Sequence, residues 1–191
     1  AQDIISGETA LTSAPAATDE FLVSDAGVLK RVDASLVGKG KVLQHKETSS
    51  SAVATGTTLI PEDDTIPQND EGTEVMTLAI TPVSATSTMY IATQVFLSMT
   101  NITRGGIALF KDTDANAVAM TSVFIKDATS MGNGIVRYAE VTGNTTARTY
   151  KVRLGGLGGS SSTVSFNGQS GSRKFGGIDT LSSLQIIEVE A

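Results

Sequence analysis

The sequence predicts an all-β protein built from antiparallel strands. Charged residues make up only 18% of the chain, whereas Ser, Thr, Gly, Ala and Val are abundant, which favours strands and turns over long helices. Apolar side chains alternate with polar ones in several segments, and turn-forming clusters separate these segments every ~8–12 residues. No helical pattern exceeds one turn, which disfavours a parallel α/β sheet. A sandwich or a barrel is the expected architecture.

The clearest strand pattern covers residues 89–99, where the odd positions hold Met, Ile, Thr, Val, Leu and Met. Successive side chains of a strand point to opposite sides, so this long period of two indicates a strand with one buried face. Shorter alternations occur at 76–80 and 150–154, and a last strand covers 184–190. From residue 41 onward we expect roughly eight to ten strands. The turn-forming clusters lie at 101–106, 112–116, 131–134, 143–144 and 155–162.

The N-terminal region differs from the rest in its pattern. Residues 1–20 show no periodicity and are expected to form an extended arm. A β-hairpin is expected next, because Phe21–Val23 and Val28–Leu29 flank the short polar turn Asp25-Ala26-Gly27, whose glycine adopts a positive φ at little cost.

A domain boundary is predicted shortly after this hairpin. Asp33–Val37 is expected to form one helical turn, capped by Asp33 and ended by Gly38. The segment Gly38–Lys41 has the composition of a flexible joint. The sequence therefore divides into an arm with a hairpin, residues 1–40, and a main β domain, residues 41–191.

The composition excludes several classes of function. The chain has no Cys and a single His, His45, which rules out disulfides, thiolate zinc sites, Cys nucleophiles and His-rich metal sites. No stretch reaches the ~20 apolar residues of a bilayer crossing, and the N-terminus lacks the features of a signal peptide. Basic residues form no continuous stripe with interleaved aromatics. We therefore expect a cytoplasmic product with no cofactor, no nucleic-acid partner and no membrane insertion.

Three motifs suggest chemistry but fit it poorly. Asp112–Asn116 begins like a calcium-binding EF-hand loop, yet Ala117 replaces the required Gly and Val123 the required Glu. Glu62–Asp64 resembles a pair of glycosidase carboxylates, but adjacent residues of an extended segment point apart. Leu154–Ser160 is glycine-rich but lacks the Lys-Ser/Thr ending and the following helix of a phosphate-binding loop. The favoured interpretations are a hairpin tip, a solvated acidic loop and a flexible surface loop, so no enzymatic activity is expected.

Two stretches resemble proteins of tailed bacteriophages. Residues 19–32, DEFLVSDAGVLKRV, follow ALTSAPAA at 10–17 and resemble a hairpin that is common in phage fibre and appendage proteins. A second likeness begins with KVLQ at 41–44, continues through IPEDDTIPQNDEGTE at 60–74 and ALFKD at 108–112, and ends with LQIIE at 184–188. This pattern is similar to the C-terminal domain of many phage tail-fibre and virion proteins, and it covers about three quarters of the chain.

The resemblance implies a homotrimeric, antiparallel jelly-roll sandwich with no shared catalytic residues. Two functions follow from it and stay open. The first is a tail-fibre or tip module that attaches to a glycan or protein of the host surface. The second is a head decoration or cement trimer, or a head fibre with a jelly-roll knob, that stabilises the capsid. A polysaccharide depolymerase is disfavoured, because the chain has three Tyr, six Phe and no Trp.

The resemblance also sets the expected partners and location. These partners are further copies of the chain and another phage structural protein, which residues 1–40 would bind. The expected location is the virion, assembled in the cytoplasm of the bacterial host. The candidate virion-anchoring residues are the apolar residues of the hairpin, because an arm without apolar periodicity needs a partner to become ordered. They are Phe21, Leu22, Val23, Val28 and Leu29.

An acidic segment at 62–74 is the candidate subunit-interface segment. It carries six acids and no base, and Pro61 and Pro67 favour an extended edge or loop over a central strand. Because like charges repel, the segment is expected to face solvent or a basic surface. That surface would come from Lys39, Lys41 and Lys46, from Arg104 and Arg173 of a neighbouring subunit, or from a cation between subunits. The acids are Glu62, Asp63, Asp64, Asp70, Glu71 and Glu74.

Overall fold

The computed structural model describes residues 15–16, 18–34, 37, 40–101, 103–158, 162–174 and 180–191. The chain folds as two compact units, Ala1–Lys41 and Val42–Ala191. No helix in these described ranges has the length and apolar character that a bilayer crossing requires.

The first unit contains the expected β-hairpin. Its strands β1 (Glu20–Asp25) and β2 (Val28–Asp33) pair antiparallel. Ala26 and Gly27 form the two-residue turn with φ of 50° and 84°, the conformation whose twist matches that of a hairpin. The expected helical turn at 33–37 lies partly outside the described residues. Its expected cap, Asp33, is the last residue of β2, and Val37 N donates to Ala34 O at 3.1 Å.

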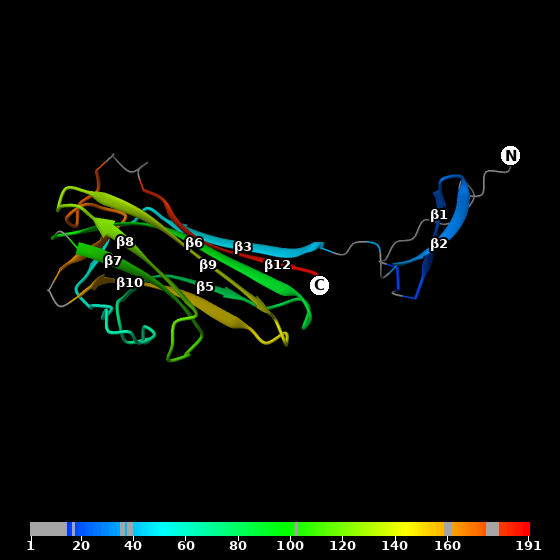
Figure 1. Cartoon of the computed structure of the whole chain (residues 1–191), viewed down its shortest axis with the longest axis horizontal. Helices are drawn as coiled ribbons and strands as arrows, with labels where there is room; N and C mark the ends of the chain where they lie inside the picture. The colour runs from blue at the N-terminus through cyan, green and yellow to red at the C-terminus, as the bar shows by residue number, and fades with distance from the viewer. Residues whose placement is uncertain are drawn as a thin grey trace. The chain divides into compact units, whose positions relative to one another are not determined.

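The second unit is a sandwich of two antiparallel sheets (Figure 1). One sheet has the order β3-β12-β6-β9 and the other has the order β5-β10-β7-β8. In the first sheet the short strand β11 pairs with the end of β6 that β12 does not reach, and β4 pairs with β11. Within its described residues this unit has ten strands, which agrees with the eight to ten expected. They are β3 (Val42–Ser50), β4 (Ala54–Gly56), β5 (Thr73–Ile80), β6 (Thr88–Met99), β7 (Thr103–Lys111), β8 (Ala119–Ile125), β9 (Met131–Val141), β10 (Arg148–Leu157), β11 (Val164–Phe166) and β12 (Ser182–Val189).

The eight long strands form four nested antiparallel pairs. The first strand pairs with the last, β3 with β12, and the pairs β5–β10, β6–β9 and β7–β8 follow inside it. A long hairpin of this kind, rolled into two facing sheets, is a jelly roll. The expected antiparallel jelly-roll sandwich is thus confirmed.

The core lies between the two sheets and follows from the alternation in the sequence. Every odd residue of β6 from Met89 to Met99 is buried, and the inward residues of β5, β10 and β12 meet them. The main cluster consists of Met76, Ile80, Met89, Ile91, Val95, Leu97, Met99, Ile107, Leu109, Ile125, Val136, Tyr150, Val152, Leu154, Val164, Phe166, Leu184 and Ile186.

Residues 57–72, here named the cover segment, lie over the outer face of the sheet β5-β10-β7-β8. Ile60 N donates to Gly156 O at 3.1 Å, and further along the segment Asn69 N donates to Ala115 O at 2.8 Å. Ile60 is fully buried. It forms a second apolar cluster with Ala108, Phe110, Leu157 and the partly buried Ala117.

Three glycine-rich stretches that the sequence predicted as turns belong to strands. Gly105 and Gly106 lie in β7, Gly132 and Gly134 in β9, and Gly155 and Gly156 in β10. The predicted flexible loop at 154–160 is therefore wrong for residues 154–157, which are buried. A glycine inside a strand often marks the close approach of another element. A Cβ on Gly155 would lie 2.8 Å from Ile60 N and 2.9 Å from Thr58 O.

Candidate assembly surfaces

The outer face of the sheet β3-β12-β6-β9, here named the open sheet face, is organised by strand register. Ile91, Thr93, Leu184 and Ile186 are buried in the sandwich, so the residues between them point outward. Residues that pair directly across strands share a face. Three rows therefore cross this face: His45–Ile187–Tyr90–Ala139, Glu47–Gln185–Ala92–Arg137 and Ser49–Ser183–Gln94–Ile135.

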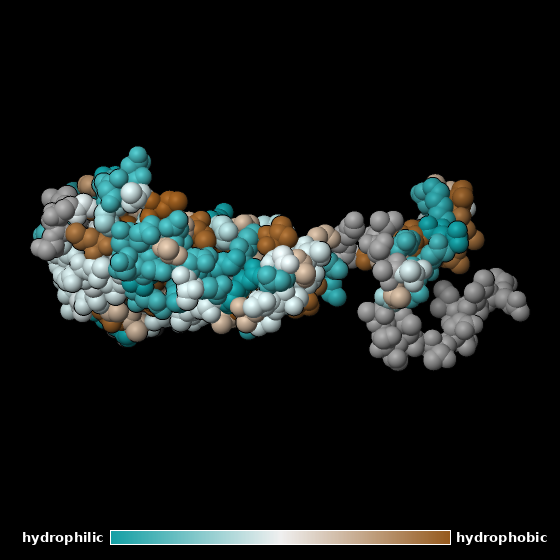
Figure 2. All heavy atoms as spheres, turned by 90° about the horizontal axis from the view of Figure 1, so that it is seen from below, coloured by the Kyte–Doolittle hydropathy of each residue, from teal (hydrophilic) through white to brown (hydrophobic). Residues whose placement is uncertain are grey.

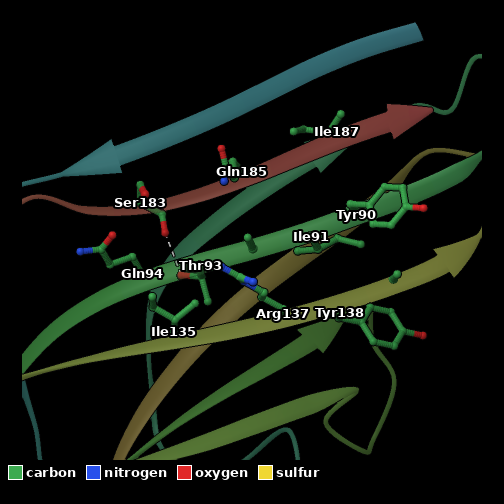
Figure 3. Close-up of a pocket in the computed structure, with 12 residues that line it drawn as sticks. Tyr90, Ile91, Thr93, Gln94, Ile135, Arg137, Tyr138, Ser183, Gln185 and Ile187 are labelled. Atoms are coloured by element: carbon green, nitrogen blue, oxygen red, sulfur yellow. Dashed lines mark hydrogen bonds between the residues drawn. The ribbon is translucent and has the colours of Figure 1, made fainter. Parts of the chain in front are cut away.

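The open sheet face is mostly uncharged. Tyr90 is 51% exposed and Ile135 49% exposed, with small or amide side chains between them. A shallow groove of about 410 Å³ runs over β12, β6 and β9 (Figure 3). Within the three rows the carboxylate of Glu47 and the guanidinium of Arg137 are the charged groups at neutral pH. Exposed apolar groups gathered on one face are characteristic of interaction surfaces.

The two sheets differ in how their outer faces are covered. The cover segment buries Ala108 and Phe110 on the outer face of the second sheet, whereas no described segment forms a comparable cluster over Tyr90 and Ile135. Sequence reasoning missed the open sheet face. A usable signal was present, because the outward positions of β6 from Tyr90 to Phe96 include no charged residue, which is unusual for a solvated strand face.

The acidic segment has the expected loop conformation up to Gly72, and its last two residues, Thr73 and Glu74, belong to β5. Its acids from Glu62 to Asp70 are exposed. Glu62 pairs with Arg104 at 2.5 Å, and Glu74 lies 3.7 Å from Arg153. Arg104, a candidate partner from a neighbouring subunit, thus contacts the segment within its own chain.

Two further acids, Asp63 and Glu71, hold the backbone of the segment itself. Asp63 accepts hydrogen bonds from the Oγ1 and backbone N of Thr65, and these bonds lower the pKa of Asp63. Glu71 accepts from Gln68 N at 2.9 Å, and Asp64 has a φ of 65°. Among the described residues there is no group of three His, Cys, Asp or Glu that could hold a metal ion. The role of the segment as a subunit interface stays a prediction.

The five candidate anchoring residues lie on the surface of the hairpin, and Figure 2 shows apolar atoms gathered there. Leu22 and Leu29 are 72% and 74% exposed, and Phe21, Val23 and Val28 are exposed as well. The register places Leu22 and Leu29 on one face of the hairpin and the other three on the opposite face. A two-stranded hairpin cannot bury its own apolar side chains, and among the described residues both of its faces carry exposed apolar side chains.

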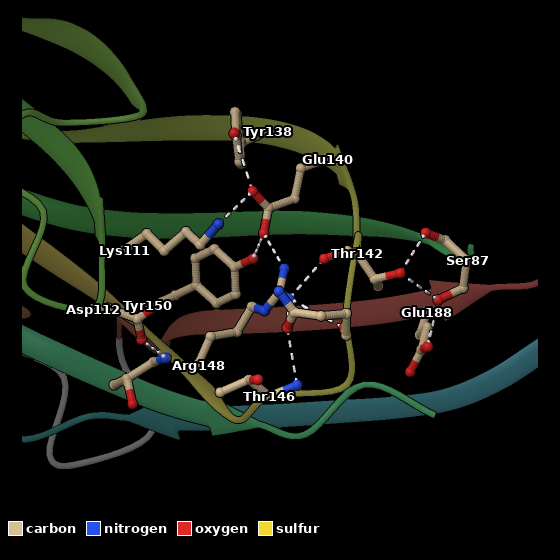
Figure 4. Close-up of polar contacts among 12 residues, drawn as sticks. Ser87, Lys111, Asp112, Tyr138, Glu140, Thr142, Thr146, Arg148, Tyr150 and Glu188 are labelled. Carbon is tan, nitrogen blue, oxygen red and sulfur yellow. Dashed lines mark hydrogen bonds and ion pairs between the residues drawn. The ribbon is translucent and has the colours of Figure 1, made fainter. Parts of the chain in front are cut away.

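A polar network closes one end of the sandwich (Figure 4). Glu140 of β9 accepts hydrogen bonds from Lys111 at 2.9 Å, Arg148 at 2.8 Å and Tyr150 at 2.6 Å, which come from the opposite sheet. Burial raises the pKa of Glu140, but these hydrogen bonds and the two cations outweigh burial and lower it overall. Burial, followed by the hydrogen bond to Glu140, raises the pKa of Tyr150.

A second carboxylate, Glu188 of β12, is fully buried at the same end. It accepts hydrogen bonds from the backbone N of Val83 at 3.0 Å and of Ser84 at 3.1 Å, and from the side chains of Gln44 and Ser87. Thr142 links the two carboxylates, because its carbonyl accepts from Arg148 and its hydroxyl contacts Ser87. Both carboxylates are occupied by protein donors, and the sequence patterns did not point to either.

The fold and these surfaces define an antiparallel jelly-roll domain with one open sheet face. The model of the Pgp3 C-terminal domain family matches residues 46–191, and the chain belongs to this family. No curated protein matches the chain. The description of this family does not mention phage appendage domains, so the resemblance to those domains stays a prediction.

Solved structures that match the chain are distant. A structure of infectious bursal disease virus, Gx strain, has a TM-score of 0.34 and 10% identity, over 87% of this chain and 40% of that chain. The VP2 subviral particle of the same virus gives 0.31 and 10%, over 90% and 44%. The enzymatically active domain of tailspike protein 4 of bacteriophage CBA120 gives 0.26 and 13%, over 68% and 20%. The chain spans less than half the length of each.

Proposed function

We propose that the protein is a structural subunit of a bacteriophage particle, and that it forms a homotrimer through its open sheet face. The observation that carries the proposal is the exposure of Tyr90 and Ile135 on this face, whereas the cover segment buries Ala108 and Phe110 on the outer face of the other sheet. Membership in a family of trimeric β-domains supports the oligomeric state. A closed cyclic assembly also protects the sheet edges at β3 and β9.

The hairpin supplies the proposed link to the particle. Its exposed Leu22 and Leu29 need a partner to leave water, and the phage-like sequence at 10–32 supports a phage structural protein as that partner. The role is proposed to be assembly and attachment without catalysis, so purified protein is expected to hydrolyse no host polysaccharide.

The end of the jelly roll remote from Val42 is proposed to face the host surface, as in a tail fibre or tip. The chain enters the sandwich at Val42, next to the end of β12, so an N-terminal anchor leaves the opposite end free. Two turns form one surface there, because Gln169 donates to Thr129 O and Ser170 to Ala128 O.

Light scattering on the purified chain tests the trimer, with an expected mass near three chains. Replacing Ile135 by Glu should give monomers, because three charges would have to enter an apolar contact without partners. Phe124→Glu is the matched control, because Phe124 is 67% exposed on β8 of the other sheet and should leave the trimer intact. A monomeric wild type at micromolar concentration would refute the trimer.

Antibody labelling of intact particles tests the particle role. Label at the tail tip is the expected result. Label on the head would replace the fibre role by capsid decoration, and particles without label would contradict the structural role altogether.

A further inference from the structure

Glu47 and Arg137 lie at opposite edges of one row of the open sheet face. Glu47 of β3 pairs with Gln185 of β12, which pairs with Ala92 of β6, which pairs with Arg137 of β9. The row therefore has an acid at one edge of the sheet, a base at the other, and only a short and an amide side chain between them.

Neither charge has a partner within the described part of the chain. Glu47 and Arg137 are both exposed, and neither side chain takes part in the ion pairs or side-chain hydrogen bonds that connect the described residues. Elsewhere on the jelly roll, by contrast, Arg104, Arg148, Arg153 and Lys111 are each paired with a carboxylate.

Cyclic symmetry would bring these two charges together at one interface between adjacent subunits. In a closed ring, each subunit presents one patch to the neighbour ahead and a different patch to the neighbour behind. An open sheet face that packs around a threefold axis therefore brings the β9 edge of one subunit toward the β3 edge of the next. Residues of the same row then meet, acid against base.

We infer that Glu47 of each subunit forms an ion pair with Arg137 of the adjacent subunit, and that these three identical pairs fix the register of the trimer. The inference rests on the proposed trimer and adds the residues that orient it. Arg suits the role because its planar guanidinium binds a carboxylate through two hydrogen bonds. A one-row slip would instead bring Arg137 next to uncharged Ser49 or to His45.

Charge reversal tests the pair. Glu47→Arg and Arg137→Glu each place like charges in contact at three sites, and each should raise the apparent dissociation constant of the trimer by ~10-fold or more, because like-charge contacts across an interface are strongly unfavourable. The double variant E47R/R137E restores opposite charges and should return the constant to within ~3-fold of wild type. Sedimentation at a series of concentrations measures all four proteins.

The matched control is Lys151→Glu, which makes the same charge change as Arg137→Glu on β10 of the other sheet and should leave association unchanged. Circular dichroism checks that every variant folds. Single variants that associate like wild type, or a double variant as weak as the sum of the singles, would overturn the pair while leaving the trimer in place. A wild type that stays monomeric, or forms dimers, would instead refute the trimer on which the pair rests.

Discussion

Glu140 and Glu188 are held at the same end of the sandwich by different means. Glu140 lies between two cations and two tyrosines, whereas all donors to Glu188 are neutral. Burial raises the pKa of Glu188, but these hydrogen bonds outweigh burial, and its pKa lies below the ordinary value of 4.5. The carboxylate form is therefore the one that stabilises the fold.

The acid dependence of stability follows from these two groups. Their folded pKa values lie below 4.5, so the stabilisation is fully present above that pH and is lost as the pH falls through the folded values. Replacing Glu188 by Gln should cost roughly 1–3 kcal/mol at pH 7, because an amide group would face backbone N–H donors. The difference in melting temperature between wild type and variant should shrink toward pH 3. A constant difference from pH 7 to pH 3 would contradict the assignment.

Gly155 is the residue whose missing side chain lets the cover segment reach the sheet. A Cβ there would meet backbone atoms of residues 58 and 60, which cannot move as a side chain can. Gly155→Ala should lower the free energy of unfolding by ~1–3 kcal/mol, as overpacking usually does. A urea titration measures this loss. Gly156→Ala is the control, because its Cβ would meet only the side chains of Met99, Leu59 and Ser162, at 3.0 Å or more. Equal effects would contradict the backbone argument.

The cover segment is the element that makes the two outer faces unequal. Ile60 anchors it by filling the space above Ala108 and Phe110, while Pro67 O accepts from Ala117 N at 2.9 Å near its other end. The acids of the segment lie on its solvent side, and their local hydrogen bonds shape the loop. The segment therefore buries apolar surface with one side and presents charge with the other.

Ile60→Ala should detach the segment before the sandwich unfolds. The loss of a buried Ile side chain costs about 2–5 kcal/mol, and here the loss acts on one external loop. Limited proteolysis should then cut within 62–70, and the strands should stay protected in hydrogen exchange. Ile66→Ala is the control, because Ile66 is 54% exposed and should change neither measurement. Global unfolding of Ile60→Ala without a cleaved intermediate would show that the segment is part of the main core.

The hairpin is the element whose loss should leave the fold intact. Removing residues 1–41 should give a folded jelly roll with a melting temperature within ~2 °C of the full chain, because the core clusters lie entirely within 60–186. The shortened chain should fail to enter particles. Leu22→Lys with Leu29→Lys should have the same effect in the full chain, and normal incorporation of either protein would refute the anchor.

For the whole molecule, nested strand pairing makes most contacts between residues distant in sequence. The β3–β12 ladder joins residues 42–50 to residues 182–189, so the first and last strands complete one sheet together. The open sheet face forms only when β3 pairs with β12, because each of its rows begins on β3 and crosses β12. Trimer assembly is thus expected to follow folding of the monomer.

Association should make the melting temperature depend on concentration. A partner that binds only the folded chain stabilises it by mass action, so the melting temperature should rise as the protein concentration is raised from micromolar to a hundred times that value. Ile135→Glu should abolish the dependence without changing the fold. A wild-type melting temperature that does not change with concentration would count against a reversible trimer.

The amino-acid pattern by itself determined the all-β fold class, the hairpin and four strands of the main domain, those that contain residues 76–80, 89–99, 150–154 and 184–188. The alternation at 89–99 specified which side chains of β6 are buried, because a period of two is a local property of extended backbone. The acidic loop was equally readable, since Pro61, Pro67 and six like charges exclude a buried strand.

The tertiary structure alone decided the glycines, the buried carboxylates and the open sheet face. The sequence alone suggests a turn at Gly155, but in the structure Ile60 packs directly against this residue. The sequence alone suggests that Glu188 is solvated, but in the structure the loop 83–87 covers it and donates hydrogen bonds to it. Glu47 and Arg137 share a row only through the register of four strands. Two of these, β3 and β12, are the first and last strands of the domain in sequence. Each of these features depends on contacts between distant segments, and a local pattern carries no record of such contacts.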